Sequence, residues 1–456
     1  MAGLRWRVLA ALALVFGGAA WGQATEEDFR VFTEHPRLFL QARRLRLLQR
    51  ETTRQSLRWQ QFEALMTGKA SMPEPGFALA LYGRVSGQSS YCEEAVRWAL
   101  GPASDLRQLA LVYDWCQPSL SDQQSQALAS KLERGVVTAS ARPGVAAVRD
   151  RVLAAVALAG HRQEVSEREL RFVVQKWWRG EIVPGIDGHR EALPRDDTLA
   201  LFEILHAVQD NVNIDLREPI AGFFRDLPAL LLASYYPSPY QAAENEYYIP
   251  VTKGGGEPDL QRAALSRAGD LSLVAYDSNT RESQFLQGWL MRDTALMRSP
   301  FGIPYEFLWA NPYLPGLSYY HAPLFFHDER LGRLFVRASW DDDATWLGYL
   351  NPELQVFTRD GLRLVKQQPA SKPIRLGEVA VVETSGAPNL RVEVADVLHV
   401  FLLGLRPGAR YELRVADGKP IQDTADTGGI VHVSLEPAAS VVIRLKELPR
   451  RPERPS

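Results

Sequence analysis

The sequence predicts a multidomain α+β protein, with helices in the N-terminal part and β-strands in the C-terminal part. Apolar residues recur every three or four positions from about Leu38 to Arg298, which is the helical period. After Phe301 they alternate with polar residues, which is the strand period. At 456 residues the chain is also long for a single hydrophobic core. We therefore expect an α/α toroid of helical hairpins at 25–312, followed by an antiparallel β-sandwich at 313–448.

The first residues, 1–24, have the pattern of a secretory signal peptide. Arg5 and Arg7 precede an apolar run, Val8–Ala20, that is too short to span a bilayer, and small residues follow it. We therefore expect a periplasmic or secreted protein with no membrane span after cleavage. A retained signal anchor is the alternative interpretation. At the other end, the tail 449–456 is rich in proline and arginine and is expected to be disordered.

The overall charge excludes some partners. The chain has 52 basic and 54 acidic residues, a formal charge of −2. This balance argues against nucleic acid as a partner, because nucleic-acid binding depends on an excess of basic residues. A uronic acid polymer could still bind through a few local arginines. No phosphate-binding loop or zinc signature is present in the sequence, so we expect no cofactor and no metal site.

Turn and cap signals divide the helical region into short helices. Ser121 can cap a helix at 122–134, and Ser166 with Glu169 has the spacing of a capping box. Further candidate helices are Ser89–Leu100, Ser104–Cys116, Val145–Ala159, Asp197–Asp210, Leu216–Ser234, Asp259–Tyr276 and Arg281–Met297. In an antiparallel helix pair Cys92 and Cys116 would be neighbours, so a disulfide between them is plausible. Two buried free thiols are the alternative.

The C-terminal part contains short alternating runs separated by turns that contain glycine. The candidate strands are Leu334–Ala338, Ala344–Tyr349, Leu354–Thr358, Ala380–Glu383, Leu390–Val394, Leu398–Leu403, Tyr411–Val415, Val431–Leu435 and Val441–Leu445. Turns with Asp360-Gly361, Pro407-Gly408 and Asp417-Gly418 separate several of them. This pattern favours antiparallel sheets packed face to face.

Several segments resemble the heparinase II/III-like polysaccharide lyases. The carriers of this resemblance are His35–Phe39, Leu109–Trp115, Val336–Trp340 with Asp343–Leu347, and Leu403–Tyr411. The resemblance implies an α/α toroid joined to a β-sandwich, with an acidic polysaccharide held between them and cleaved by β-elimination. The sequence departs from the family in two places. No His-x-x-x-Asp element follows Leu347, and no tyrosine begins the helix after Arg195.

The candidate site residues come from two segments and from scattered aromatic residues. Tyr319, Tyr320 and His321 form the tightest acid/base cluster, and we expect Tyr320 or His321 to move the proton. His189 is a further catalytic candidate, in a polar loop at 180–195. The alternative for the tyrosines is that their rings only pack at the domain interface. The alternative for His189 is that its loop is polar and solvated, without a function. The expected substrate-binding residues are Arg190, Arg195, Tyr247, Tyr248 and Trp309.

Three functions remain open at this point. The first is an exported protein that binds an acidic polysaccharide and cleaves it by β-elimination. The second is a non-catalytic glycan-binding or envelope protein on the same scaffold, which the two departures from the family pattern favour. The third is a glycoside hydrolase that uses Asp187 and Asp197, since hydrolysis needs two facing carboxylates.

Overall fold

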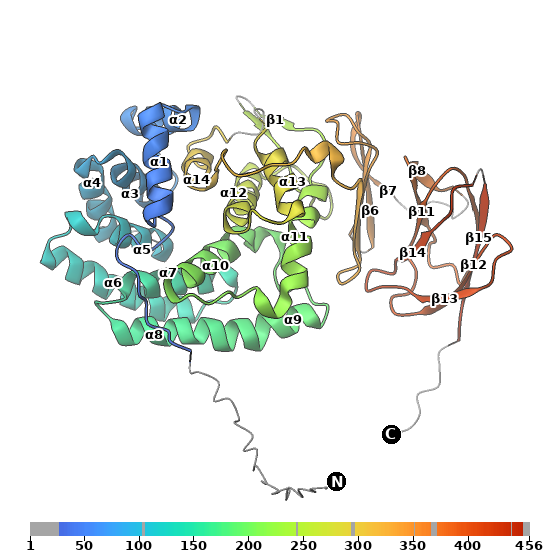
Figure 1. The fold of residues 1–456 in the computed structure, drawn as a ribbon, viewed down its shortest axis with the longest axis horizontal. Helices are drawn as coiled ribbons and strands as arrows, with labels where there is room; N and C mark the ends of the chain where they lie inside the picture. Colours follow the sequence, from blue (N-terminus) through green and yellow to red (C-terminus); the bar gives the residue numbers. More distant parts are fainter. Residues whose placement is uncertain are drawn as a thin grey trace, which may run out of the picture.

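The protein is α+β, with helices in the N-terminal part and β-sheets in the C-terminal part (Figure 1). The computed structural model describes residues 27–102, 105–242, 245–292, 297–350, 352–365, 372–438 and 440–449. The predicted signal peptide and all but the first residue of the predicted tail lie outside these ranges. Among the described residues, none of the helices has the length and apolar character needed to cross a membrane.

The helices are short and joined mainly by tight turns. In chain order they are α1 Ala42–Arg54, α2 Leu57–Thr67, α3 Pro75–Ser86, α4 Ser89–Leu100, α5 Leu106–Trp115, α6 Asp122–Ser140, α7 Val145–Leu158, α8 Gln163–Arg171, the π-helix η2 Phe172–Ile182, α9 Val183–Asp187, α10 Thr198–Val212, α11 Ala221–Ala233, α12 Leu260–Tyr276, α13 Arg281–Leu290 and α14 Gly302–Trp309. Short 3-10 turns include Glu218–Ile220 before α11 and Tyr319–His321 after α14.

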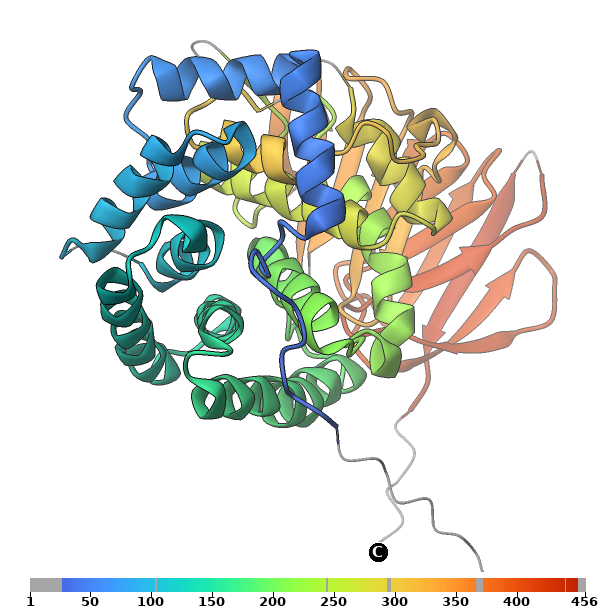
Figure 2. The ribbon, with the colours of Figure 1, turned by 60° about the vertical axis from the view of Figure 1, so that its left-hand side comes forward.

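Six of these helices form a closed series of contacts. Along the chain α3, α5, α7, α10, α12 and α14 each pack against the next, and α14 returns to α3. In Figure 2 the helices follow one another around an arc. All ten residues of α5 are buried, because this helix is covered by neighbours on every side. The remaining helices lie outside the series and present polar residues to solvent.

The local sequence signals predict some helix ends correctly and others wrongly. Ser121 caps α6 through a complete capping box with Gln124. The capping box expected at Ser166 is wrong, because this residue lies inside α8 and is fully buried. The helix expected to run to residue 297 ends at Leu290, and residues 293–296 lie outside the described part. Periodicity alone did not indicate these two ends.

The disulfide between Cys92 and Cys116 is present, with the two Cα atoms 5.4 Å apart. Cys92 lies in the first turn of α4, and Cys116 directly follows α5. The antiparallel pairing that the sequence predicts therefore brings the two thiols together.

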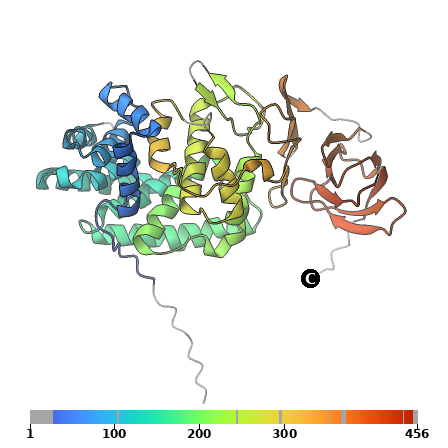
Figure 3. The same cartoon turned by 45° about the horizontal axis from the view of Figure 1, so that its top comes forward.

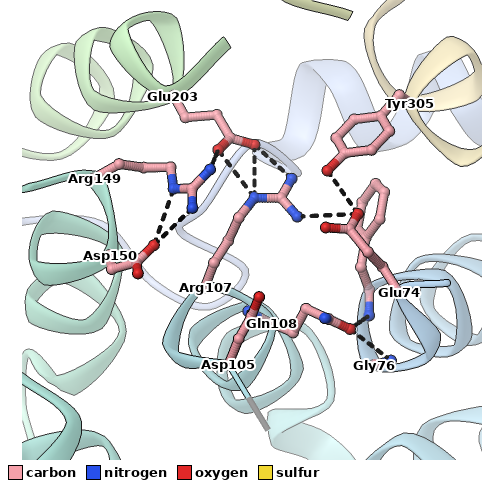
Figure 4. A network of polar contacts seen from close by, with 10 residues as sticks. Glu74, Gly76, Asp105, Arg107, Gln108, Arg149, Asp150, Glu203 and Tyr305 are labelled. Atoms are coloured by element: carbon pink, nitrogen blue, oxygen red, sulfur yellow. Dashed lines mark hydrogen bonds and ion pairs between the residues drawn. The ribbon is translucent and has the colours of Figure 1, made fainter. Parts of the chain in front are cut away.

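The six helices of the closed series are called the inner helices. Ion pairs connect several of them close to their N-terminal turns (Figure 4). The guanidinium of Arg107 on α5 donates to the carboxylate of Glu203 on α10, with contacts of 2.6 to 3.1 Å. Arg149 on α7 lies 3.5 Å from the same carboxylate. Glu74 before α3 lies 3.6 Å from Arg107 and accepts a 2.6 Å hydrogen bond from the hydroxyl of Tyr305 on α14. Five elements far apart in sequence are joined in this way.

Strands in the C-terminal part form three sheets, and a two-stranded hairpin interrupts the helical part. The hairpin is β1 Tyr240–Ala242 with β2 Asn245–Tyr247. The first sheet has the order β3-β4-β5-β6-β7, the second β14-β11-β9-β8 and the third β10-β15-β12-β13. Their bounds are β3 Phe325–Asp328, β4 Arg333–Arg337, β5 Trp346–Leu350, β6 Glu353–Thr358, β7 Gly361–Val365, β8 Ile374–Leu376, β9 Val379–Glu383, β10 Asn389–Val394, β11 His399–Leu403, β12 Arg410–Val415, β13 Ile421–Thr424, β14 Val431–Ser434 and β15 Val441–Glu447.

The second sheet is the middle layer and is buried on both faces. On β11, Phe401 and Leu403 pack with the first sheet, and Val400 and Leu402 pack with the third. The two-residue period of a strand places these pairs on opposite faces. Strands β9 and β11 run parallel, so the prediction of purely antiparallel pairing is wrong. A strand buried on both faces carries a continuous apolar run, which suits parallel pairing.

The first sheet packs its other face against the helical part (Figure 3). Trp346 on β5 donates from its indole nitrogen to the carbonyl of Ala233 at the end of α11, at 3.0 Å. Tyr236 donates to the side-chain oxygen of Gln355 on β6, at 2.8 Å. Two buried polar side chains, those of Trp346 and Tyr236, are therefore paired across this junction.

Candidate functional site

Aromatic and charged side chains gather where the first sheet meets the helical part. Tyr319, Tyr320 and His321 form a 3-10 turn that packs on α13. The rings of Tyr319 and Tyr320 are stacked, with their centroids 4.6 Å apart, and the ring centroids of Tyr319 and Trp340 are 6.2 Å apart in a T-shaped arrangement. Tyr320 is 56% exposed, so its ring and hydroxyl are available to a ligand.

Arg292, just after α13, is the centre of this group. Its guanidinium donates to the hydroxyl of Tyr248 at 2.5 Å and to the carboxylate of Asp342 at 2.8 Å. It also lies over the rings of Tyr248 and Tyr319, at 4.8 and 5.3 Å from their centroids. We call Tyr248, Arg292, Tyr319, Tyr320 and Asp342 the junction cluster. It joins the helical part to the loop between β4 and β5.

Below the junction cluster a second guanidinium adds positive charge. Arg337, at the end of β4, is buried, lies 4.4 Å from the ring of Trp340 and donates to the carbonyl of Tyr235. Burial, and then the nearby charge of Arg292, lowers the pKa of Arg337 to about 9. Asp342 raises the pKa of both arginines but forms an ion pair with Arg292 alone in the described part of the chain. Two guanidinium groups therefore lie beside one ion-paired carboxylate, while the flanking Asp343 pairs with Arg359.

The hydroxyl of Tyr319 is protonated at neutral pH. Burial, and then its neighbour Tyr320, raises the pKa of Tyr319 to about 12. Its hydroxyl therefore stays protonated and could protonate a departing oxygen, but it could not remove a proton from a sugar at neutral pH. A base would have to come from another group, such as Tyr320 or His321.

Arg195 is turned inward. It donates to the hydroxyl of Ser234 at 2.6 Å, lies 3.3 Å from the carboxylate of Asp270, and covers the ring of Tyr235 at 4.4 Å. Tyr235 in turn donates to Asp270 at 2.7 Å. Burial raises the pKa values of Tyr235 and Asp270. Arg195 neutralises a buried carboxylate in this arrangement, and this structural role competes with the predicted substrate-binding one.

The predicted loop residues do not join the junction cluster. His189 and Arg190 are exposed, after α9, and His189 has a positive φ of 56°. The next residue, Glu191, forms an ion pair with Arg333 at the start of β4. In the described part of the chain, no hydrogen bond or ion pair connects His189 or Arg190 with the 3-10 turn at 319–321. A catalytic role for these two residues stays a prediction.

Two other predicted residues lie elsewhere. Tyr247 ends β2 and borders a small hollow beside Tyr248. Trp309 ends α14 and is 1% exposed. It stacks with His206 at 4.8 Å and lies under the guanidinium of Arg44 at 4.7 Å. Trp309 therefore belongs to a different cavity from the junction cluster.

The sequence interpretation found the tyrosines of the junction cluster and missed its charged residues. The helical period predicts Arg292 inside a helix, but this helix ends two residues before it. A basic residue just beyond the end of α13, within the tyrosine-rich region, was the available signal for Arg292. Nothing in the sequence pairs it with Asp342, which lies 50 residues further along the chain.

No family model matches the chain, and no curated protein matches its sequence. Among solved structures, one similar chain is described as a glycoside hydrolase. The TM-score is 0.32 and the sequence identity 9%, over 82% of this chain and 71% of the other. A TM-score this low does not establish a shared fold.

Proposed function

We propose that this chain is an exported protein of heparinase II/III-like architecture that binds an acidic polysaccharide at the junction cluster. In this proposal the closed series of helices is a toroid, and the sheets form the sandwich beside it. The observation that carries the proposal is that Arg292 is ion-paired with Asp342, the nearby Arg337 has no ion pair among the described residues, and the exposed ring of Tyr320 stacks on Tyr319 beside Arg292.

The chemistry of the cluster suits a sugar that carries a carboxylate. A guanidinium presents several donors in a plane and binds carboxylates through paired hydrogen bonds. An exposed tyrosine ring offers an apolar face to sugar C–H groups and a hydroxyl for hydrogen bonding. An incoming carboxylate could replace Asp342 as the partner of Arg292, because Asp342 is itself half exposed.

Cleavage by β-elimination is a second candidate function at the same place. The specific support is Tyr319, whose hydroxyl stays protonated at neutral pH and lies beside an exposed second tyrosine. β-Elimination needs a base at C5–H of the uronic acid, an acid at the leaving oxygen and a positive charge near the carboxylate. Tyr319 would be the acid, Arg292 would hold the carboxylate, and Tyr320 or His321 would be the base.

Binding is tested by affinity electrophoresis of the chain without residues 1–24, in gels that contain polygalacturonate, alginate or neutral dextran. We expect retardation in one or both uronans and none in dextran. Arg292→Gln and Tyr320→Ala should each weaken binding by about tenfold or more, since a hydrogen bond to a charged group contributes about 1.5 to 3 kcal/mol. Arg391→Gln, an exposed arginine on β10, is the matched control.

The same samples separate binding from cleavage. Cleavage creates an unsaturated sugar that absorbs in the ultraviolet, and Tyr319→Phe should remove this signal while retardation persists. Retardation without absorbance on any uronan would favour the non-catalytic function. Equal retardation of the Arg292→Gln, Tyr320→Ala and control variants would show that the junction cluster is not the binding site.

A further inference from the structure

A cavity of about 910 Å³ lies at the C-terminal ends of α10, α12 and α14, next to α1. Its volume is within the usual range for ligand pockets. It shares no residue with the junction cluster. Asn279, just before α13, lines the cavity, whereas Arg292 of the cluster follows the other end of this ten-residue helix. Such a helix is about 15 Å long, so the two places are separate.

One wall of the cavity is a row of arginines on α1. Arg43, Arg46 and Arg50 are spaced by three and four residues, which places them on one face of the helix. All three are exposed, and none forms an ion pair in the part of the chain that the structure describes. They extend over about 10 Å along the helix axis. This row suits charges spread along a chain better than a single compact anion.

The carboxylates of the cavity do not neutralise its arginines. Five arginines line it, the fourth and fifth being Arg44 and Arg217, against two aspartates. Arg217 is already paired with two carboxylates, Asp215 at 2.8 Å and Asp277 at 2.5 Å, so the positive excess comes from the row on α1. Burial raises the pKa of Asp210 to about 6, so this carboxyl is partly protonated in mildly acidic solution. A positive excess remains for an anionic ligand.

Aromatic side chains form the floor of the cavity. Trp309 lies under Arg44, and Tyr276 lies under Arg217 with its ring centroid 4.7 Å from the guanidinium. The indole nitrogen of Trp309 is buried and has no hydrogen-bond partner among the described residues.

We propose that this cavity is a second binding site, for a linear oligosaccharide that carries several carboxylates. The arginines of α1 hold successive carboxylates, and the aromatic floor contacts the sugar rings. The two sites are independent: this one rests on the row of arginines and the cavity, and stands whether or not the junction cluster binds a glycan.

The test compares two triple variants by calorimetric titration with oligogalacturonates of defined length. Arg43→Gln, Arg46→Gln and Arg50→Gln together remove the row. The control carries Arg363→Gln, Arg391→Gln and Arg414→Gln, three exposed arginines on the sheets, and has the same change of charge. At low salt, the affinity of the first variant at one of the two sites should be about tenfold or more lower than that of the wild type. The control should remain within about twofold of the wild type.

A second measurement locates the ligand. In the wild type, oligogalacturonate should protect Arg43, Arg46 and Arg50 from phenylglyoxal, as read by mass spectrometry, whereas neutral malto-oligosaccharide should not. Arg292→Gln should leave this protection unchanged, which separates failure here from failure of the junction site. Unchanged affinity of the first variant, or no protection of the three arginines, would overturn the proposal.

Discussion

Glu203→Gln tests whether the ion pairs between the inner helices hold the helical part together. Glu203 is fully buried and accepts three contacts of 3.1 Å or less from Arg107, which is 1% exposed. Burial alone would lower the pKa of Arg107, but the neighbouring charges, Glu203 first, raise it well above its ordinary value. The amide keeps the shape of the side chain and removes its charge, so Arg107 becomes a buried cation with a weaker partner.

The magnitude follows from what remains around Arg107. Removal of one partner from a buried ion pair costs about 3 to 5 kcal/mol of unfolding free energy. Glu74 stays 3.6 Å from Arg107, so we expect the lower end of this range, about 3 kcal/mol. Arg149 keeps Asp150 as a partner at 2.8 Å and adds little to the loss.

The assay is urea unfolding followed by far-ultraviolet circular dichroism, which reports mainly on the helices. The midpoint should fall while the denaturant dependence of the free energy stays the same. Glu94→Gln, at an exposed position on α4, is the control and should change stability by less than about 0.5 kcal/mol. If Glu203→Gln costs no more than this control, buried charge is not what connects these helices, and the reasoning is wrong.

Three further predictions concern other parts of the chain. Replacing both Cys92 and Cys116 by alanine should lower the unfolding free energy by about 3 kcal/mol, because the disulfide closes a loop with a sequence separation of 24. Gly332→Ala should destabilise the sheets by about 3 kcal/mol, because its φ is 59° and a Cβ would lie 1.9 Å from the nitrogen of Gly428. The pKa of His432 is lowered to about 4 by burial and by the neighbouring His399 and His327. Between pH 6.5 and 4 the unfolded chain therefore binds a proton at this side chain that the native state does not bind. The free energy of unfolding should fall by about 2 kcal/mol over this range.

Each of these has a measurement that could contradict it. An equal melting temperature with and without reductant would exclude the contribution of the disulfide. Gly377→Ala, with a φ of 55° and open space around a Cβ, separates backbone strain from collision. An equal loss in both glycine variants would show that collision is unimportant. His432→Gln should flatten the acid dependence, and an unchanged slope between pH 6.5 and 4 would assign it to other groups.

Much of the local structure could be predicted, because its causes lie within a few residues. The helical period predicts the helices α12 and α5. The parallel pairing of β9 with β11 could not be predicted. The two strands are 20 residues apart in sequence, and the apolar side chains of β11 would be buried whether it ran parallel or antiparallel to β9. The same limit applies to the candidate site. Tyr319 and Tyr320 are adjacent in sequence, but Arg292 and Asp342 reach them only because α13 packs against α11 and α11 packs against the first sheet.

By itself, the sequence determined the division into helices and strands and the capping of α6, and it made a disulfide between Cys92 and Cys116 plausible. These features depend on periodicity and on neighbouring residues. The tertiary structure alone decided which arginines meet a carboxylate. Arg107 is neutralised by Glu203, whereas Arg43 on α1 faces an open cavity. The physical reason is that ion pairing depends on distances of a few ångströms between segments far apart in the chain, and only packing sets those distances.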